Sequence, residues 1–257
     1  MNKHLFFMFL TTCLLVCSYA LGENADSTVV KKHKVDTVYC GWSLQADIAS
    51  PLMGLTIDKS VRTAEIAFDV NLFNKIFPTV ELGYGQVATT ANSEASYSTA
   101  APFWRIGFNY NIMRRFDDNG NPKPTHNYPF VGLRYGMTVM NYTMTNVPVS
   151  DDYWGGSSQF DYNYRNAYVG WLEILAGVRV DLVKGFTMGW AIRMKMAAHA
   201  KTNKALLWYV PGLGHSDGLT FSFSYTIGFT YRTKAEREKV EKIRLEENKR
   251  EYVTLKK

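Results

Sequence analysis

The chain has 257 residues, of which 46% are hydrophobic and 14% aromatic, and its formal net charge is +6. The charge is uneven, because residues 232–257 hold ten Lys or Arg against six Glu and contribute +4 of it. A positive balance confined to one tail does not indicate a nucleic-acid-binding surface, so we expect no nucleic acid partner. Metal-ligand spacings, phosphate-cradling glycine motifs and dinucleotide fingerprints are missing from the sequence, and we expect no metal, cofactor or catalytic site.

The first 22 residues have the pattern of a secretory signal, with a basic start at Lys3 and an apolar run from Leu5 to Val16. That run is about 12 residues, shorter than the roughly 18 of a membrane-spanning helix, and no later segment is longer. Any membrane span must therefore consist of strands. Cys17 leaves open a lipoprotein signal, which we consider the weaker alternative. Cys40 is the one cysteine beyond residue 22, and we expect it to be buried or lipid-facing.

Residues 23–37 are polar and predict a periplasmic lead-in, and eight alternating stretches follow between residues 38 and 231. The last of them, Thr220–Tyr231, is the most regular, with aromatic and aliphatic residues on one face and Thr, Ser and Gly on the other. Its twelve residues suit a tilted strand that crosses a bilayer, which needs roughly 9–11. The other seven stretches are Val38–Ile48, Thr63–Leu72, Val80–Gly85, Trp104–Ile112, Val131–Val139, Trp171–Asp181 and Met188–Ala197.

The connections between these stretches alternate between shorter and longer ones. Outer-membrane barrels have short periplasmic turns and long outer loops, and an even number of strands places both termini on one side. We therefore expect both termini in the periplasm and the segment Tyr142–Asn166 to form an outer loop. Residues 232–257 lack Gly and Pro, which predicts a charged C-terminal helix. Its few apolar residues favour a solvated helix over a docked one, and a helix lying on an anionic leaflet is the alternative.

These features resemble the small eight-stranded bacterial outer-membrane barrels of the outer membrane protein A-like superfamily. The resemblance covers Val38 to Tyr231 and rests on the alternating pattern, the signal and the aromatic end of the last strand. It implies an all-β fold, an eight-stranded antiparallel transmembrane β-barrel in the bacterial outer membrane. It also implies contact with outer-membrane lipid, insertion by the β-barrel assembly machinery and a monomer. The charged extension past Tyr231 departs from many members, which end at the closing aromatic residue.

A soluble antiparallel barrel is the alternative, because alternation with a period of two does not say which face points inward. Glycine weakens a solvent-facing strand, whereas inside a narrow barrel it makes room for a neighbouring Arg or Trp. Nine glycines share a face with the charged residues, which favours the membrane barrel. They are Gly41, Gly83, Gly85, Gly107, Gly132, Gly136, Gly177, Gly189 and Gly228.

Six acids and five bases occupy the face that would point into the lumen. They are Asp47, Glu65, Asp69, Glu81, Glu173 and Asp181, with Arg105, Arg134, Arg179, Arg193 and Lys195. An unpaired charge there is costly, so the balance predicts an ion-pair network that crosses the lumen. Within the last long hairpin, Glu173 should lie opposite Arg193 or Lys195. We favour a plug of side chains over the alternatives of an ion or proton path and an acid–base pair of Asp69 and Glu81.

The predicted outer loop contains aromatic residues interleaved with acids, a composition that suits contact with a surface glycan or protein. The candidate contact residues are Tyr153, Trp154, Phe160, Tyr162 and Tyr164. Packing of these rings on each other is the competing interpretation. His199 and His215 lie near the same end of the chain's strands and leave an outer-leaflet lipid-modifying enzyme as an alternative. The sequence thus favours a structural or interaction role over a narrow channel or an enzyme.

Overall fold

The computed structural model describes residues 38–56, 59–91, 94–113, 127–150, 157–183, 185–202, 206–216, 218–239, 241–242 and 245. The chain divides into two units, residues 1–36 and 37–257, and only the second contains described residues. The predicted signal (residues 1–22) and lead-in (residues 23–37) lie outside them.

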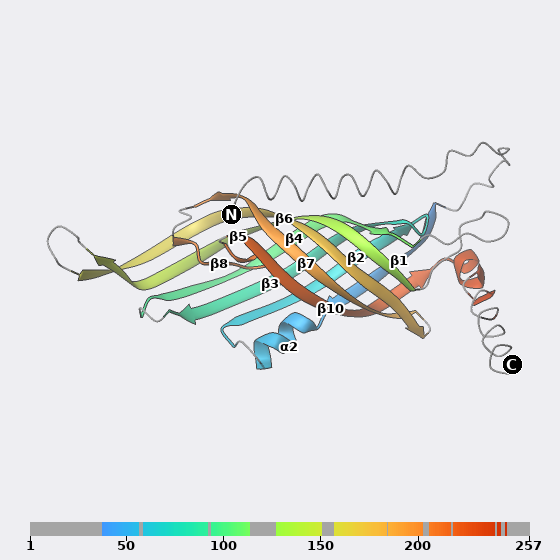
Figure 1. Cartoon of the computed structure of the whole chain (residues 1–257), viewed down its shortest axis with the longest axis horizontal. Coiled ribbons are helices and arrows are strands. Elements are labelled where there is room, and N and C mark those ends of the chain that lie inside the picture. The colour runs from blue at the N-terminus through green and yellow to red at the C-terminus, as the bar shows by residue number, and fades with distance from the viewer. Residues whose placement is uncertain are drawn as a thin grey trace. The chain divides into compact units, whose positions relative to one another are not determined.

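Eight antiparallel strands close into one barrel (Figure 1), in the order β1-β10-β7-β6-β5-β4-β3-β2. The eight-stranded barrel predicted from the sequence is therefore confirmed. The barrel strands are β1 (Tyr39–Asp47), β2 (Val61–Leu72), β3 (Ile76–Thr90), β4 (Ser96–Asn111), β5 (Asn127–Ser150), β6 (Ser157–Val183), β7 (Phe186–Lys201) and β10 (Leu219–Arg232). The described residues between them also form helix α2 (Ala49–Thr56) and a small hairpin of β8 (Tyr209–Val210) and β9 (Gly214–His215). We call the end where β1 begins the terminal end and the opposite one the hairpin end.

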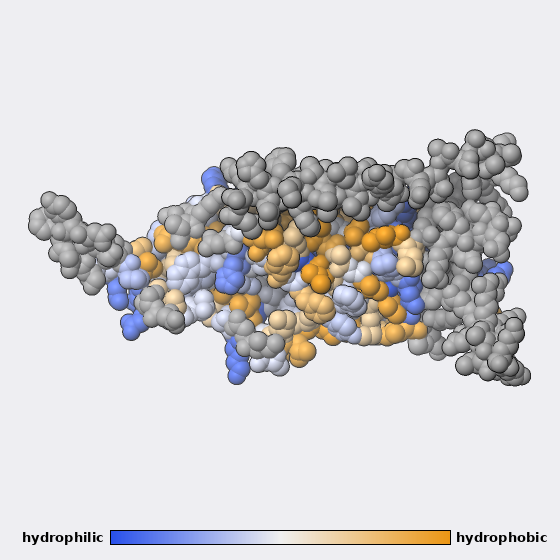
Figure 2. All heavy atoms as spheres, viewed as in Figure 1, coloured by the Kyte–Doolittle hydropathy of each residue, from blue (hydrophilic) through white to orange (hydrophobic). Residues whose placement is uncertain are grey.

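The outward face of the barrel is apolar and the inward face is charged. Large hydrophobic side chains stay exposed on every barrel strand, for example Leu44, Ile66, Leu82, Ile106, Leu133, Ile174, Ile192 and Phe223. Figure 2 shows a concentration of hydrophobic side chains, in orange, along the middle of the visible face. The charged side chains are buried inside, which is the reverse of a soluble barrel, so the barrel is of the transmembrane type. No helix among the described residues is long and apolar enough to span a membrane.

The glycines on the inward face make room for large neighbouring side chains, as predicted from the sequence. The Cβ atom of any larger residue at Gly136 would collide with the ring of Trp171, which is fully buried in the barrel. Gly83 makes room for Phe103 in the same way. A narrow barrel can therefore hold large interior side chains because their neighbours have none.

The strands are longer than the alternating pattern predicted. The prediction that Tyr142–Asn166 forms a loop is wrong, because most of this segment belongs to β5 and β6. β5 and β6 stay paired beyond the barrel wall as far as Ser150 and Ser157, and Figure 1 shows them reaching past the other strands. Two register shifts interrupt this hairpin, between Met140 and Tyr142 and between Met144 and Val147. The first shift reverses the inward parity of β6 near Asn166, and the second reverses that of β5 near Asn146, so a strict period of two does not run through the whole hairpin.

The segment of residues 206–216, which includes β8 and β9, folds into the hairpin end of the barrel; we call it the plug segment. Leu207, Val210 and Leu213 are buried against the apolar interior walls of β3 to β6. The Gly212 carbonyl accepts hydrogen bonds from Lys195 and Arg105 inside the barrel. The interior therefore has a charged zone towards the terminal end and an apolar zone towards the hairpin end.

The C-terminal helix is present at residues 234–239, and residues 241, 242 and 245 are also helical. The expectation of a fully solvated helix is wrong, because Glu236 is only 2% exposed. Its carboxylate accepts a hydrogen bond of 2.6 Å from Asn74 in the turn between β2 and β3. The Thr233 amide donates to the carbonyl of Cys40, which is buried at a β-bulge of β1. Polar contacts and not an apolar face thus dock the start of the helix.

Candidate functional site

The charged zone of the lumen centres on Glu81 of β3, which is paired with three arginines. Arg105 from β4, Arg134 from β5 and Arg193 from β7 lie 2.8, 3.2 and 2.7 Å from its carboxylate. Because β3 and β7 are not neighbours in the barrel, the contact between Glu81 and Arg193 crosses the lumen. All four side chains are buried. One carboxylate therefore ties opposite walls of the barrel together.

Arg105 connects this centre to two further acids. Its guanidinium binds both oxygens of Glu65, at 2.7 and 3.0 Å. Its Nε lies 2.7 Å from Glu173 Oε1, although the N–H is not aligned for a hydrogen bond. Trp171 donates its indole N–H to the same oxygen at 2.7 Å. The acids and bases hold each other in place, which is the condition for stable burial of charge.

A second layer lies nearer the terminal end. Arg179 of β6 binds Asp69 of β2 at 2.8 Å. Its guanidinium also lies over the rings of Phe77, Tyr128 and Phe130, the first two of which stack at 5.0 Å. Beyond this layer Arg232 forms an ion pair with Asp181. The lumen is thus crossed by arginine–carboxylate pairs at successive heights.

The structure brings together most of the predicted network, with three differences. Asp47 lies outside the network, because its carboxylate accepts hydrogen bonds from the backbone amides of Ala49 and Ser50 and so caps α2. Lys195 and Arg193 were the two predicted partners of Glu173. Lys195 lies directly opposite Glu173 in the strand register but forms no ion pair among the described residues. Arg193 lies 3.4 Å from the Glu173 carboxylate. Arg232, which the sequence places in the charged tail, is the last residue of β10 and belongs to the network. Its side chain points inward because every second residue of β10 does, so continuing that alternation past Thr230 identifies it.

Asp69 and Glu81 do not form the acid–base pair considered from the sequence. Each is neutralised by arginines of its own, Asp69 by Arg179 and Glu81 by its cluster of three. Two cavities among the described residues are small. One of about 30 Å³ is lined by both layers, and one of about 10 Å³ is lined by the second layer and Arg232. A single water occupies about 30 Å³ in the liquid, so these cavities hold isolated waters at most.

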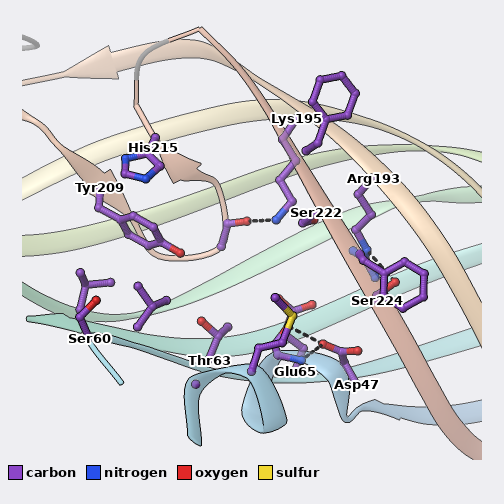
Figure 3. Close-up of a pocket in the computed structure, with 18 of the residues that line it drawn as sticks. Asp47, Ser60, Thr63, Glu65, Arg193, Lys195, Tyr209, His215, Ser222 and Ser224 are labelled. Atoms are coloured by element: carbon purple, nitrogen blue, oxygen red, sulfur yellow. Dashed lines mark hydrogen bonds between the residues drawn. The ribbon is translucent and has the colours of Figure 1, made fainter. Parts of the chain in front are cut away.

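A much larger cavity, of about 640 Å³, lies towards the hairpin end; we call it the side pocket. Its walls come from Asp47 at the end of β1 and from α2, β2, β3, β7, β10 and the plug segment. In Figure 3, Arg193 and Lys195 enter it opposite Thr63 and Glu65. Sequence analysis missed this pocket, because neither α2 nor the inward fold of the plug segment leaves a period-two signal.

The residues considered for contact or catalysis at the hairpin end have packing roles where they are described. Tyr162 and Tyr164 stack with each other at 6.2 Å and pack with Tyr142 against the apolar interior. Phe160 is half-buried on β6, opposite Val147, and Tyr153 and Trp154 lie outside the described residues. His199 stacks on Tyr168 at 5.1 Å, and His215 packs edge-on against Tyr209.

Comparison with known proteins bears on the family and the fold. No curated protein matches the chain. Among solved structures, Ail, the attachment invasion locus protein of Yersinia pestis, crystallised with the heparin analogue sucrose octasulfate, is similar. The match covers 76% of this chain and 95% of Ail at 11% identity, with a TM-score of 0.33, and at that level we rest no argument on it. A family model matches residues 3–233, and the chain therefore belongs to the family described as Domain of unknown function (DUF6048).

Proposed function

We propose that the protein is a small bacterial outer-membrane barrel that does not conduct and acts through contacts at its surface. The observation that carries this proposal is the Glu81 cluster, in which three arginines from three strands meet one carboxylate inside the lumen. An eight-stranded barrel is only just wide enough to be filled by its side chains. A permeating ion would have to displace buried guanidinium groups that are each held by a carboxylate, which is energetically costly.

The part that supports an interaction role is the hairpin of β5 and β6 beyond the barrel wall. On β5 the outward face changes from Val131, Leu133 and Val139 to Asn141, Thr143 and Thr145. Lipid-facing strands are apolar, so this change marks the level at which the hairpin leaves the bilayer. From Val139 to Ser150 the strand extends about 35 Å at roughly 3.3 Å per residue.

The tyrosines inside this hairpin make it rigid, and its other face is available to a partner. Tyr142 is buried between Tyr97 and Tyr164, with ring centroids 5.7 and 5.6 Å away. On the opposite face Asp161, Asn163 and Arg165 are exposed. A rigid, polar projection of this kind suits contact with a surface glycan or protein, the partner class that we propose.

The proposed topology places the hairpin end outside the cell and both termini in the periplasm. Long projections of outer-membrane barrels are extracellular, and short turns such as the one between β2 and β3 are periplasmic. The C-terminal helix, docked beside that turn through Glu236, then lies at the periplasmic mouth. We also propose that the β-barrel assembly machinery inserts the protein as a monomer, because the eight strands of one chain close the barrel without a second copy.

Planar-bilayer recording of the purified protein tests the proposal. We expect conductance near the baseline, and Arg134→Ala should raise it, because this substitution removes one side chain of the central layer. Conductance of the unmodified protein comparable to that of an open porin would contradict the proposal and favour the narrow channel. Turnover of labelled lipid that is abolished by His199→Ala or His215→Ala would instead favour the enzyme.

A further inference from the structure

The wall of the barrel has a gap between β2 and β10 towards the hairpin end. β1 is short and pairs with its neighbours only as far as Asp47, which lies opposite Glu65 on β2 and Thr226 on β10. Beyond that level, residues 61–64 of β2 and 219–224 of β10 have described strand partners only on their far sides, β3 and β7. The side pocket therefore faces the surrounding lipid at a place where no strand separates the two.

Helix α2 stands in this gap and leaves it partly open. Asp47 caps the helix, and Gly54 allows it to approach β2 so closely that an added Cβ atom would lie 2.5 Å from the Val61 carbonyl oxygen. Leu55 of α2 is 66% exposed and Phe221 of β10 is 64% exposed, so both flank the gap as part of the apolar outer surface. The helix thus belongs to the lipid-facing surface and packs more tightly on β2 than on β10.

The pocket behind the gap contains a buried cation, Lys195, whose described hydrogen-bond partner is a backbone carbonyl. Lys195 is only 7% exposed, and its Nζ donates to the Gly212 carbonyl at 2.7 Å. No described carboxylate forms an ion pair with it, and the oxygens of nearby Glu65 are both bound by Arg105. An ammonium group has three N–H donors, so this one can bind an anion as well.

The two carboxylates that line the pocket are held by other groups. Arg105 binds both oxygens of Glu65, and Asp47 accepts hydrogen bonds from the amides of Ala49, Ser50 and Tyr225. Neither of them pairs with Lys195, whose ammonium group keeps donors for a further anion. The hydroxyls of Ser222 and Thr63 also line the pocket, and the side chains that lead to the gap are Met53, Phe221 and Phe223.

We infer that the side pocket binds a single-chain anionic lipid, a fatty-acid carboxylate, that enters sideways from the bilayer. The carboxylate sits at Lys195 and the acyl chain leaves through the gap past Met53 and Phe223. The pocket volume of about 640 Å³ lies within the roughly 300–1,000 Å³ of ligand sites. The inference is independent of whether the lumen conducts, since the ligand neither enters nor leaves through the charged layers.

A photoreactive fatty acid tests this inference. Full-length protein in phosphatidylcholine nanodiscs is irradiated with dodecanoate that carries an aliphatic diazirine near its chain end, and crosslinked residues are mapped by mass spectrometry. We expect labelling concentrated at Met53, Phe221 and Phe223. Unlabelled dodecanoate should compete, whereas dodecyltrimethylammonium, which has the same chain and the opposite charge, should not.

Two variants and one control make the test specific. Lys195→Met should raise the dodecanoate concentration needed for half-maximal competition at least about tenfold, or about 1.4 kcal/mol, because a charge-assisted hydrogen bond is lost. Ser222→Trp should abolish the labelling by filling the pocket. Lys201→Met, the same substitution at an exposed position of β7, should leave it unchanged. Labelling spread evenly over the apolar belt, without competition, or unaffected by Lys195→Met, would overturn the inference.

Discussion

Neutralising Glu81 is the most informative perturbation of the barrel, because one carboxylate there serves three arginines. Glu81→Gln keeps the size of the side chain and removes its charge. Arg134 then loses its only described carboxylate and keeps Asn109 and the Leu133 carbonyl. Arg105 and Arg193 keep other acids. Leaving a buried charge without its partner costs about 3–5 kcal/mol, so we expect a loss of that size in the free energy of unfolding.

Glu65→Gln is the matched control. Among the described residues Glu65 pairs with Arg105 alone, and Arg105 keeps Glu81 and Glu173. The side chain of Glu65 is 11% exposed. Water reaches the site, so we expect a loss of about 1–2 kcal/mol. Combining Glu81→Gln with Arg134→Met should cost less than the sum of the two single changes, because the second change removes the stranded charge.

Urea unfolding in lipid vesicles, followed by tryptophan fluorescence and by heat-dependent gel migration, measures these differences. Buried Trp171 donates to Glu173 within the same network, so it contributes to the change in emission when the layer unfolds. A loss for Glu81→Gln below about 0.5 kcal/mol, or one equal to that of Glu65→Gln, would refute the reasoning that the central carboxylate ties the walls together.

Three further predictions address the outer face, the interior packing and the topology. Ile106→Arg, on the exposed apolar face of β4, should cost roughly 2–4 kcal/mol if it lies near the midplane, and Ser158→Arg on the projecting hairpin should cost nothing measurable. Gly136→Leu should prevent assembly or cost several kcal/mol by collision with Trp171, and Trp171→Ala should partly rescue it. In a cysteine-free background, a membrane-impermeant maleimide added to intact cells should label Ser158→Cys and spare Glu238→Cys, and labelling of the latter would invert the topology.

The sequence by itself determined the fold class and the contents of the lumen. Alternation with a period of two separates apolar from charged faces on every strand, and the glycines on the charged face indicate which one points inward. The near balance of acids and bases then requires pairing, whatever the exact partners are. For this reason the eight strands, the closed barrel and the buried positions of Glu81, Arg105 and Arg134 could all be predicted.

Only the tertiary structure decided which charges meet, how far the strands extend and where the barrel wall is open. Partners across a lumen depend on strand tilt and stagger, which no local pattern encodes, so the approach of Arg193 to Glu81 could not be derived. Bulges near Asn146 and Asn166 reverse the parity and hide the continuation of β5 and β6. The gap beside α2 arises because β1 is shorter than the two strands that pair with it, β2 and β10. The sequence does not show that β10 pairs with β1, because that pairing forms only when the barrel closes.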